Sequence, residues 1–185
     1  MKKHIPNIFT LLNLSAGLTV ILLLLQPEHP HKQLIAPVLI VMGGVADFFD
    51  GYLARKLNAV TDMGKQLDSF ADIITFGVAP VCLVMYRMPH QYFTWIAAVC
   101  LLYVVAGAYR LARYNLNDFR DHFIGLPITA AGIILAAYCS IYSHWTNEAP
   151  PVINAAITGM VMLLLGIMMV SRKKFRRFCD ILRQK

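Results

Sequence analysis

The sequence has 185 residues, of which 58% are hydrophobic and only 15% are charged. An ordinary soluble domain of this length presents a more polar surface to water, so the composition excludes that class. The formal net charge is +7 at pH 7, but the basic residues are distributed between apolar runs. That distribution follows membrane topology and excludes nucleic acid as the expected partner.

Six apolar runs lie along the chain, and each is long enough to cross a bilayer core of about 30 Å. With their expected helical extensions they cover residues 8–25, 34–57, 65–86, 92–114, 124–143 and 151–170. No small-x-small cleavage site follows the first run, so we expect an uncleaved helix there and not a signal peptide. We therefore predict an all-α integral membrane protein, with one domain over residues 1–185 and six transmembrane helices.

The basic residues predict the orientation of these helices. An even number of spans places both termini on one side, and 15 of the 17 Lys and Arg residues then fall on that side. Because positive charge is retained in the cytoplasm, we expect both termini to be cytoplasmic and the protein to lie in the cell membrane. The basic tail 171–185 either rests on anionic lipid headgroups or serves only as a stop-transfer anchor.

Four aspartates interrupt the second and third apolar runs: Asp47, Asp50, Asp68 and Asp72. Residues three or four positions apart share a helix face, so each pair forms a polar stripe, and the short connection lets the two stripes face each other. A charge near the bilayer centre costs at least about 2.5–3.5 kcal/mol, and neighbouring carboxylates also repel one another. A bound cation removes both problems. Oxygen ligands without His or Cys favour Mg²⁺ or Mn²⁺, and four carboxylates formally balance two such ions.

Small residues and one arginine accompany the aspartates. Gly51, Ala54 and Gly64 clear the helix surface for a ligand that approaches the backbone. Alternatively, they allow close contact between helices, which is common in membranes. Arg55 lies about one turn from Asp50, where it is placed to bind a phosphate or, alternatively, to extend to the membrane interface. Cations and a guanidinium beside open backbone suit a pyrophosphate better than a bare ion.

The complete spacing is Asp47-x2-Asp50-Gly51-x2-Ala54-Arg55-x8-Gly64-x3-Asp68-x3-Asp72. It resembles the signature of the CDP-alcohol phosphatidyltransferases, which are integral membrane enzymes with six transmembrane helices. All eight defining positions match, and the layout of six spans extends the resemblance over the whole chain. The resemblance implies transfer of a phosphatidyl group from CDP-diacylglycerol to an alcohol, with release of CMP.

The resemblance also implies roles for individual residues. Asp47, Asp50, Asp68 and Asp72 would hold two metal ions, with Asp47 and Asp68 bridging both, and Asp72 would also be the catalytic general base for the acceptor hydroxyl. The residues that would contact CDP-diacylglycerol are Asn7, Thr10, Gly51, Ala54, Arg55, Thr61, Gly64 and Lys65. For Thr61 the alternative is an N-cap of the third helix, and for Asn7 and Thr10 it is ordinary capping at the membrane interface.

The acceptor is harder to infer. The segments "LARYN" (111–115) and "FIGLP" (123–127) resemble the branch of the family that uses L-serine. Arg110, Arg113 and Asn115 would then bind the serine carboxylate, although positive-inside topology alone also explains the two arginines. Thr129 departs from the family pattern, which usually has a proline there. A homodimer is expected by resemblance only.

Two alternatives remain open. Within the family, glycerol 3-phosphate or an inositol phosphate is the rival acceptor, but either should require a denser basic pocket. From another class, a divalent-cation transporter would need acidic residues on several helices, whereas only the second and third apolar runs carry them here.

Overall fold

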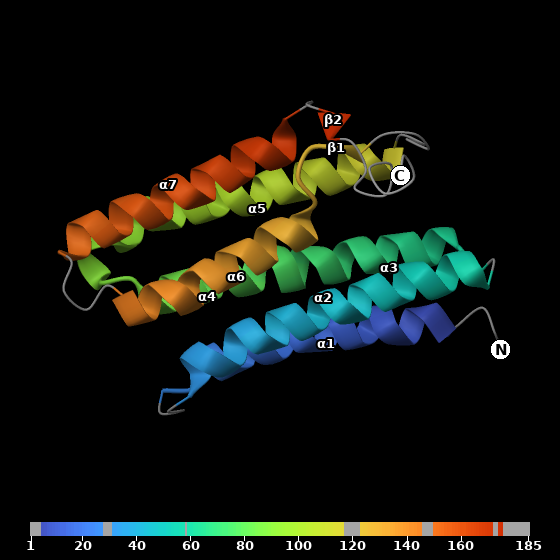
Figure 1. The fold of residues 1–185 in the computed structure, drawn as a ribbon, viewed down its shortest axis with the longest axis horizontal. Helices are drawn as coiled ribbons and strands as arrows, with labels where there is room; N and C mark the ends of the chain where they lie inside the picture. Colours follow the sequence, from blue (N-terminus) through green and yellow to red (C-terminus); the bar gives the residue numbers. More distant parts are fainter. Residues whose placement is uncertain are drawn as a thin grey trace, which may run out of the picture.

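The computed structural model describes residues 5–27, 31–57, 59–116, 123–145, 150–171 and 174–175. These parts of the chain are almost entirely helical (Figure 1). The elements are α1 (Ile5–Leu25), α2 (Lys32–Lys56), α3 (Asp62–Asp72), η2 (Ile73–Val78), α4 (Ala79–Arg87), η3 (His90–Tyr92), α5 (Phe93–Leu116), β1 (Phe123–Ile124), α6 (Ile128–Trp145), α7 (Pro151–Val170) and β2 (Lys174–Phe175).

Five helical segments in the described part of the chain are long and apolar enough to cross a membrane. They are Pro6–Leu25, Lys32–Lys56, Asp62–Arg87, His90–Leu116 and Pro151–Val170. A further helix, α6, is apolar over the shorter stretch Ile128–Ile141. The prediction of an all-α, multi-pass membrane protein is therefore confirmed, with five long apolar helices and one shorter one.

The helix α6 begins at Ile128, later than the predicted start at residue 124. Phe123 and Ile124 instead form β1, which pairs antiparallel with β2. Gly125 follows with φ of 77°, a conformation that favours glycine. The N–H of Leu126 then donates to the carbonyl of Met168 at 3.0 Å, near the end of α7. This part of the apolar run is thus a turn attached to α7, which hydropathy alone does not distinguish from a helix.

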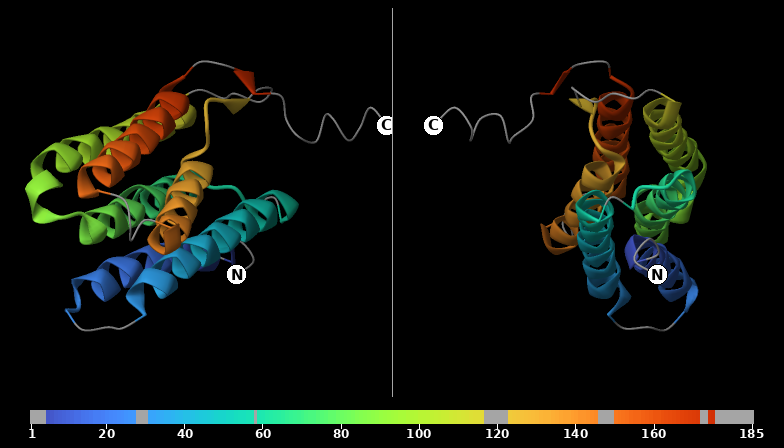
Figure 2. Two further views of the ribbon diagram at one scale, coloured as in Figure 1. Left: turned by 60° about the vertical axis from the view of Figure 1, so that its left-hand side comes forward. Right: turned by 90° about the vertical axis from the view of Figure 1, so that its right-hand side faces the viewer.

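Two helix pairs enclose a middle layer. α1 packs against α2, α5 packs against α7, and α3, α4 and α6 lie between these pairs (Figures 1 and 2). The first turns of α1, α3 and α6 and the last turns of α2, α5 and α7 lie at one end of the bundle, which we call the aspartate end. Lys32 and Arg87 lie at the opposite end, where they donate to the backbone carbonyls of Gln26 and Cys139.

The third span changes its helical geometry directly after Asp72. Residues Ile73–Val78 form the π-helical segment η2, and Pro80 lies in the first turn of α4. Proline lacks an N–H, and its ring displaces the carbonyl four residues earlier, which belongs to Phe76. That carbonyl accepts a hydrogen bond from Tyr103 Oη on α5 at 3.1 Å. A neighbouring helix therefore satisfies the freed backbone group, as lipid surroundings require.

Candidate active site

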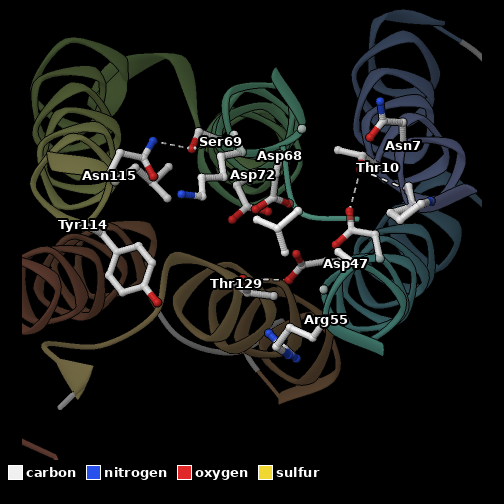
Figure 3. A pocket seen from close by; sticks show the side chains of 18 of the residues that line it. Asn7, Thr10, Asp47, Arg55, Asp68, Ser69, Asp72, Tyr114, Asn115 and Thr129 are labelled. Carbon is white, nitrogen blue, oxygen red and sulfur yellow. Dashed lines mark hydrogen bonds between the residues drawn. The ribbon is translucent and has the colours of Figure 1, made fainter. Parts of the chain in front are cut away.

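A cavity of about 560 Å³ opens at the aspartate end among α1, α2, α3, α5 and the start of α6 (Figure 3). Carboxylates, hydroxyls, amides and basic side chains line it. The lining residues that the sequence predicted are Asn7, Thr10, Asp47, Asp50, Gly51, Ala54, Arg55, Thr61, Gly64, Lys65, Asp68, Asp72, Arg110 and Asn115. The fold thus brings residues from four helices and one connection into a single cavity.

Three of the four aspartates form a tight cluster in this cavity. One carboxylate oxygen from each of Asp47, Asp50 and Asp68 lies within 4.8 Å of the other two. Asp47 and Asp50 belong to α2 and Asp68 to α3, so the two predicted polar stripes do face each other. Asp72 lines the same cavity one turn after Asp68, but it lies outside the tight group. The structure therefore separates one carboxylate from the other three.

Hydroxyl groups from two other helices bind the carboxylates of α2. Thr10 Oγ1 on α1 donates to Asp50 Oδ2 at 2.7 Å, and Asp50 is only 6% exposed. Thr129 Oγ1 on α6 donates to Asp47 Oδ2 at 3.2 Å (Figure 3). The hydroxyl of Thr10, which we expected to contact the CDP group, is therefore engaged with an aspartate in this structure.

Asp72 receives its hydrogen bond from an amide. Asn13 Nδ2 on α1 donates to Asp72 Oδ1 at 3.4 Å, and Asn13 is fully buried. The backbone carbonyl of Asn13 accepts from Thr75 Oγ1 at 2.8 Å, within the π-helical segment that follows Asp72. Two contacts from one residue of α1 thus hold the segment that carries Asp72.

The carboxylate cluster has the donor set that a hard divalent cation prefers. Asp68 Oδ1 is buried and, among the described residues, has no hydrogen-bond partner. A buried carboxylate oxygen without a donor is costly unless a cation supplies the missing interaction. Oxygen ligands alone, without His or Cys, favour Mg²⁺ or Mn²⁺ over softer metals. The residues present therefore fit a divalent metal site.

Gly51 on α2 leaves space in the cavity, whereas Gly64 on α3 is closely packed. The three atoms nearest to a Cβ added at Gly51 all belong to the Arg55 guanidinium, at 3.5 Å or more. Gly51 thus clears the cavity wall and is not a helix contact. At Gly64 an added Cβ would lie 3.0 Å from Thr61 Oγ1. Thr61 is the N-cap of α3, because its hydroxyl accepts from the N–H of Gly64, and it lines the cavity as well.

The residues expected to bind the acceptor do not all reach the cavity. Arg110 lines it and is only 7% exposed, and its Nε has no hydrogen-bond partner within the described residues. Asn115 also lines it, but its Nδ2 donates to Ser69 Oγ at 2.8 Å (Figure 3). Arg113 does not belong to the lining, and its Nη1 donates to the carbonyl of Val170 at 3.2 Å. The expectation for Arg113 is therefore not supported by its position.

Sequence reasoning missed two residues that bind aspartates. Asn13 lies three residues after Thr10, so it falls near the same face of α1, and a polar amide within an apolar run was the available signal. Thr129 was noticed only as a departure from the family pattern. Its hydrogen bond spans 82 positions of the sequence, and no local pattern predicts such a contact.

Comparison with known proteins decides the family. The model of the CDP-alcohol phosphatidyltransferase family matches residues 3–171, which include the whole aspartate motif. The chain belongs to this family. The resemblance inferred from residues 47–72 is thereby confirmed, and a divalent-cation transporter is no longer favoured.

Relatives within the CDP-alcohol phosphatidyltransferases carry a common name. A Bacillus subtilis protein named CDP-diacylglycerol–serine O-phosphatidyltransferase is 38% identical over 95% of this chain and 92% of its own length. A Methanocaldococcus jannaschii protein of the same name is 32% identical over 94% of this chain and 74% of its own length. Both alignments extend over nearly the whole membrane domain and are not confined to the motif.

Proposed function

We propose that this protein transfers the phosphatidyl group of CDP-diacylglycerol to L-serine, giving phosphatidylserine and CMP. The observation that carries the proposal is the position of Asp72, one turn from a three-carboxylate cluster and inside the same cavity. The relatives' names support serine as the acceptor. Arg110 is consistent with serine too, since a buried guanidinium that lines the cavity can pair with its carboxylate.

The aspartates have two roles in this proposal. Asp47, Asp50, Asp68 and Asp72 would hold two divalent cations, Mg²⁺ or Mn²⁺, which when bound would supply positive charge to the pyrophosphate and to the departing CMP. Asp72 also accepts the proton of the serine hydroxyl. The serine oxygen forms a bond to the phosphorus of the phosphatidyl group, while the bond from that phosphorus to the oxygen of CMP breaks. No covalent enzyme intermediate is required.

The remaining lining residues bind the nucleotide part of the donor. Gly51 and Ala54 leave room for the CDP group beside α2, and Arg55 contacts a phosphate. The same cavity is also lined by Asn7, Thr61, Gly64 and Lys65, which complete the contacts with CDP. Thr10 acts on the donor site through Asp50, to which it is hydrogen-bonded.

The diacylglycerol part has an apolar route beside the cavity. Phe48 lines the cavity and is also 65% exposed on the outer face of α2. In a membrane that outer face meets lipid, because most other exposed residues of the long helices are apolar. The headgroup of the donor then occupies the cavity while its acyl chains stay in the bilayer.

The proposal includes the location of the active site. The distribution of Lys and Arg supports a cell-membrane protein whose aspartate end faces the cytoplasm. A homodimeric state is also proposed, on family resemblance alone. In a background without other cysteines, a membrane-impermeant thiol reagent added to intact cells should label His90→Cys but not Asp62→Cys. The reverse pattern would contradict the cytoplasmic assignment.

The acceptor is tested with purified protein in detergent. The protein is mixed with CDP-diacylglycerol, Mn²⁺ and one acceptor, and the release of CMP is measured. The acceptors are L-serine, glycerol 3-phosphate and inositol phosphate. We expect CMP and phosphatidylserine with L-serine only. Release with glycerol 3-phosphate but not with L-serine would replace the proposed acceptor while keeping the family chemistry.

A further inference from the structure

Thr129 connects α6 to the carboxylate cluster. It lies in the first turn of α6, lines the cavity, and donates its hydroxyl proton to Asp47 Oδ2 at 3.2 Å (Figure 3). The helix α6 carries none of the four aspartates, so this hydrogen bond connects a separate element to the site. The proposed reaction assigns no role to Thr129.

The packing of α6 fixes the position of this hydroxyl. A Cβ added at Gly44, one turn before Asp47, would lie 2.9 Å from Ile133 Cδ1 of α6. A Cβ added at Gly132, one turn after Thr129, would lie 2.6 to 2.7 Å from Phe76 atoms of η2, including its backbone. A larger residue at Gly132 would push α6 away from η2, because it would meet the backbone of Phe76, whereas at Gly44 the end of the Ile133 side chain can shift. Gly132 thus allows α6 to approach closely enough for Thr129 to reach Asp47.

The segment before α6 is fixed as well. Gly125 adopts φ of 77° against the end of α7, where an added Cβ would lie 2.6 Å from the Met169 carbonyl. Leu126 donates its N–H to the Met168 carbonyl at 3.0 Å. The first turn of α6 is therefore held from both sides, and Thr129 presents its hydroxyl from a rigid position.

Asp47 is a cluster aspartate whose orientation its surroundings leave open. Like Asp68 it is only partly buried in the cavity, whereas Asp50 is buried. A carboxylate in an open cavity rotates about its last torsion unless a donor holds one oxygen. The hydroxyl of Thr129 holds Oδ2 and so keeps Asp47 in the cluster with Asp50 and Asp68, in which one oxygen of each carboxylate lies within 4.8 Å of the other two.

We propose that Thr129 is a positioning residue for the cation site, which holds the carboxylate of Asp47 in the orientation that binds the metal. Hydrogen-bond partners of metal-binding carboxylates generally strengthen binding, and their loss lowers metal affinity by about 10- to 100-fold. This proposal rests on the cation-holding role of the aspartates in the proposed function. It does not depend on which alcohol is the acceptor.

The test measures Mn²⁺ binding directly, in detergent and without substrates, by electron paramagnetic resonance of free Mn²⁺. Thr129→Val keeps the shape of the side chain but has no donor, and we expect its Kd for Mn²⁺ to rise by about tenfold or more. Thr129→Ser keeps the hydroxyl and should bind nearly as tightly as the unmodified protein. Thr158→Val is the matched control, because the hydroxyl of Thr158 contacts Tyr138 and the Asn154 carbonyl, away from the cavity.

A second readout separates positioning from general structure. Thr129→Val should need a higher Mn²⁺ concentration for half-maximal CMP release and should recover most of its kcat at saturating Mn²⁺. If Thr129→Val does not fold, Thr129→Ala replaces it, with thermal unfolding as the check. Unchanged Mn²⁺ affinity in a folded donor-less variant would overturn the proposal.

The same experiment distinguishes this proposal from the proposed function. If the unmodified protein binds no Mn²⁺, both the cation role and the role of Thr129 are wrong. If it binds Mn²⁺ with the expected dependence on Thr129 but releases no CMP with L-serine, the acceptor assignment fails and the role of Thr129 is supported.

Discussion

Asn13 Nδ2 donates a hydrogen bond to Asp72 Oδ1 at 3.4 Å, although the two residues are 59 positions apart in the chain. Asn13 is fully buried within α1, and its own carbonyl accepts from Thr75 at 2.8 Å. An amide donor beside a carboxylate fixes its orientation without adding a charge. The proposed general base is thus oriented by a helix that carries none of the motif aspartates.

Asn13→Leu should lower kcat for CMP release by about tenfold or more, since the variant keeps the branched shape of the side chain, although it is larger, and cannot orient Asp72. The KM for CDP-diacylglycerol should change little. Thr75→Val is the control, because it removes the hydrogen bond to the Asn13 carbonyl and leaves the amide in place. If both variants lose stability and activity in proportion, Asn13 serves only to pack the helices.

Asp72→Asn should abolish phosphatidyl transfer, because an amide cannot accept the proton of the acceptor hydroxyl. It should still bind Mn²⁺, since Asp47, Asp50 and Asp68 form the tight cluster without it. Asp62→Asn is the matched control: Asp62 is exposed in the first turn of α3 and pairs with Lys65 at 3.9 Å, so turnover should be retained. Turnover by a purified Asp72→Asn variant would show that another group is the base.

Gly17→Ala should lower the stability of the protein, whereas Gly51→Ala should weaken binding of CDP-diacylglycerol. An added Cβ at Gly17 would lie 2.5 Å from Thr75 Oγ1 and 2.8 Å from Thr75 Cα, so backbone must shift. Such overpacking typically costs about 1–3 kcal/mol, and thermal unfolding in detergent should show the loss.

At Gly51 the nearest atom to an added Cβ is Arg55 Nη1 at 3.5 Å, which is an ordinary contact. Gly51→Ala should therefore unfold at the temperature of the unmodified protein. Its KM for CDP-diacylglycerol should rise, because the methyl group occupies the cavity. A Gly51 variant with unchanged KM would place the CDP group elsewhere.

Arg110→Gln should raise the KM for L-serine by about tenfold or more, because loss of a charged partner for a carboxylate typically costs about 1.5–3 kcal/mol. The KM for CDP-diacylglycerol should change much less. Arg113→Gln is the matched control, because it removes the other arginine of α5 that was expected to bind serine. Arg113 donates to the Val170 carbonyl outside the cavity, so its loss should lower stability and leave the KM for L-serine unchanged. A serine KM that responds to Arg113 and not to Arg110 would reverse their roles.

Much of the candidate site could be predicted without the structure, because it depends on local periodicity. Asp47 and Asp50 share a face of α2, and Asp68 and Asp72 share a face of α3, since residues three or four apart lie together on a helix. The short connection between these helices then makes the stripes neighbours. The apolar runs likewise predicted the membrane class, because a bilayer requires long uncharged helices.

Contacts between helices distant in the chain depended on the tertiary structure alone. Arg110 and Arg113 lie on one helix and have the same chemistry, yet only Arg110 lines the cavity, because packing sets the rotation of α5. The partners of the carboxylates were decided in the same way: Asn13 and Thr129 reach Asp72 and Asp47 from α1 and α6. Sequence determines which residues share one helix face. Only the packing of side chains between helices, including the glycines that permit close approach, decides which faces meet.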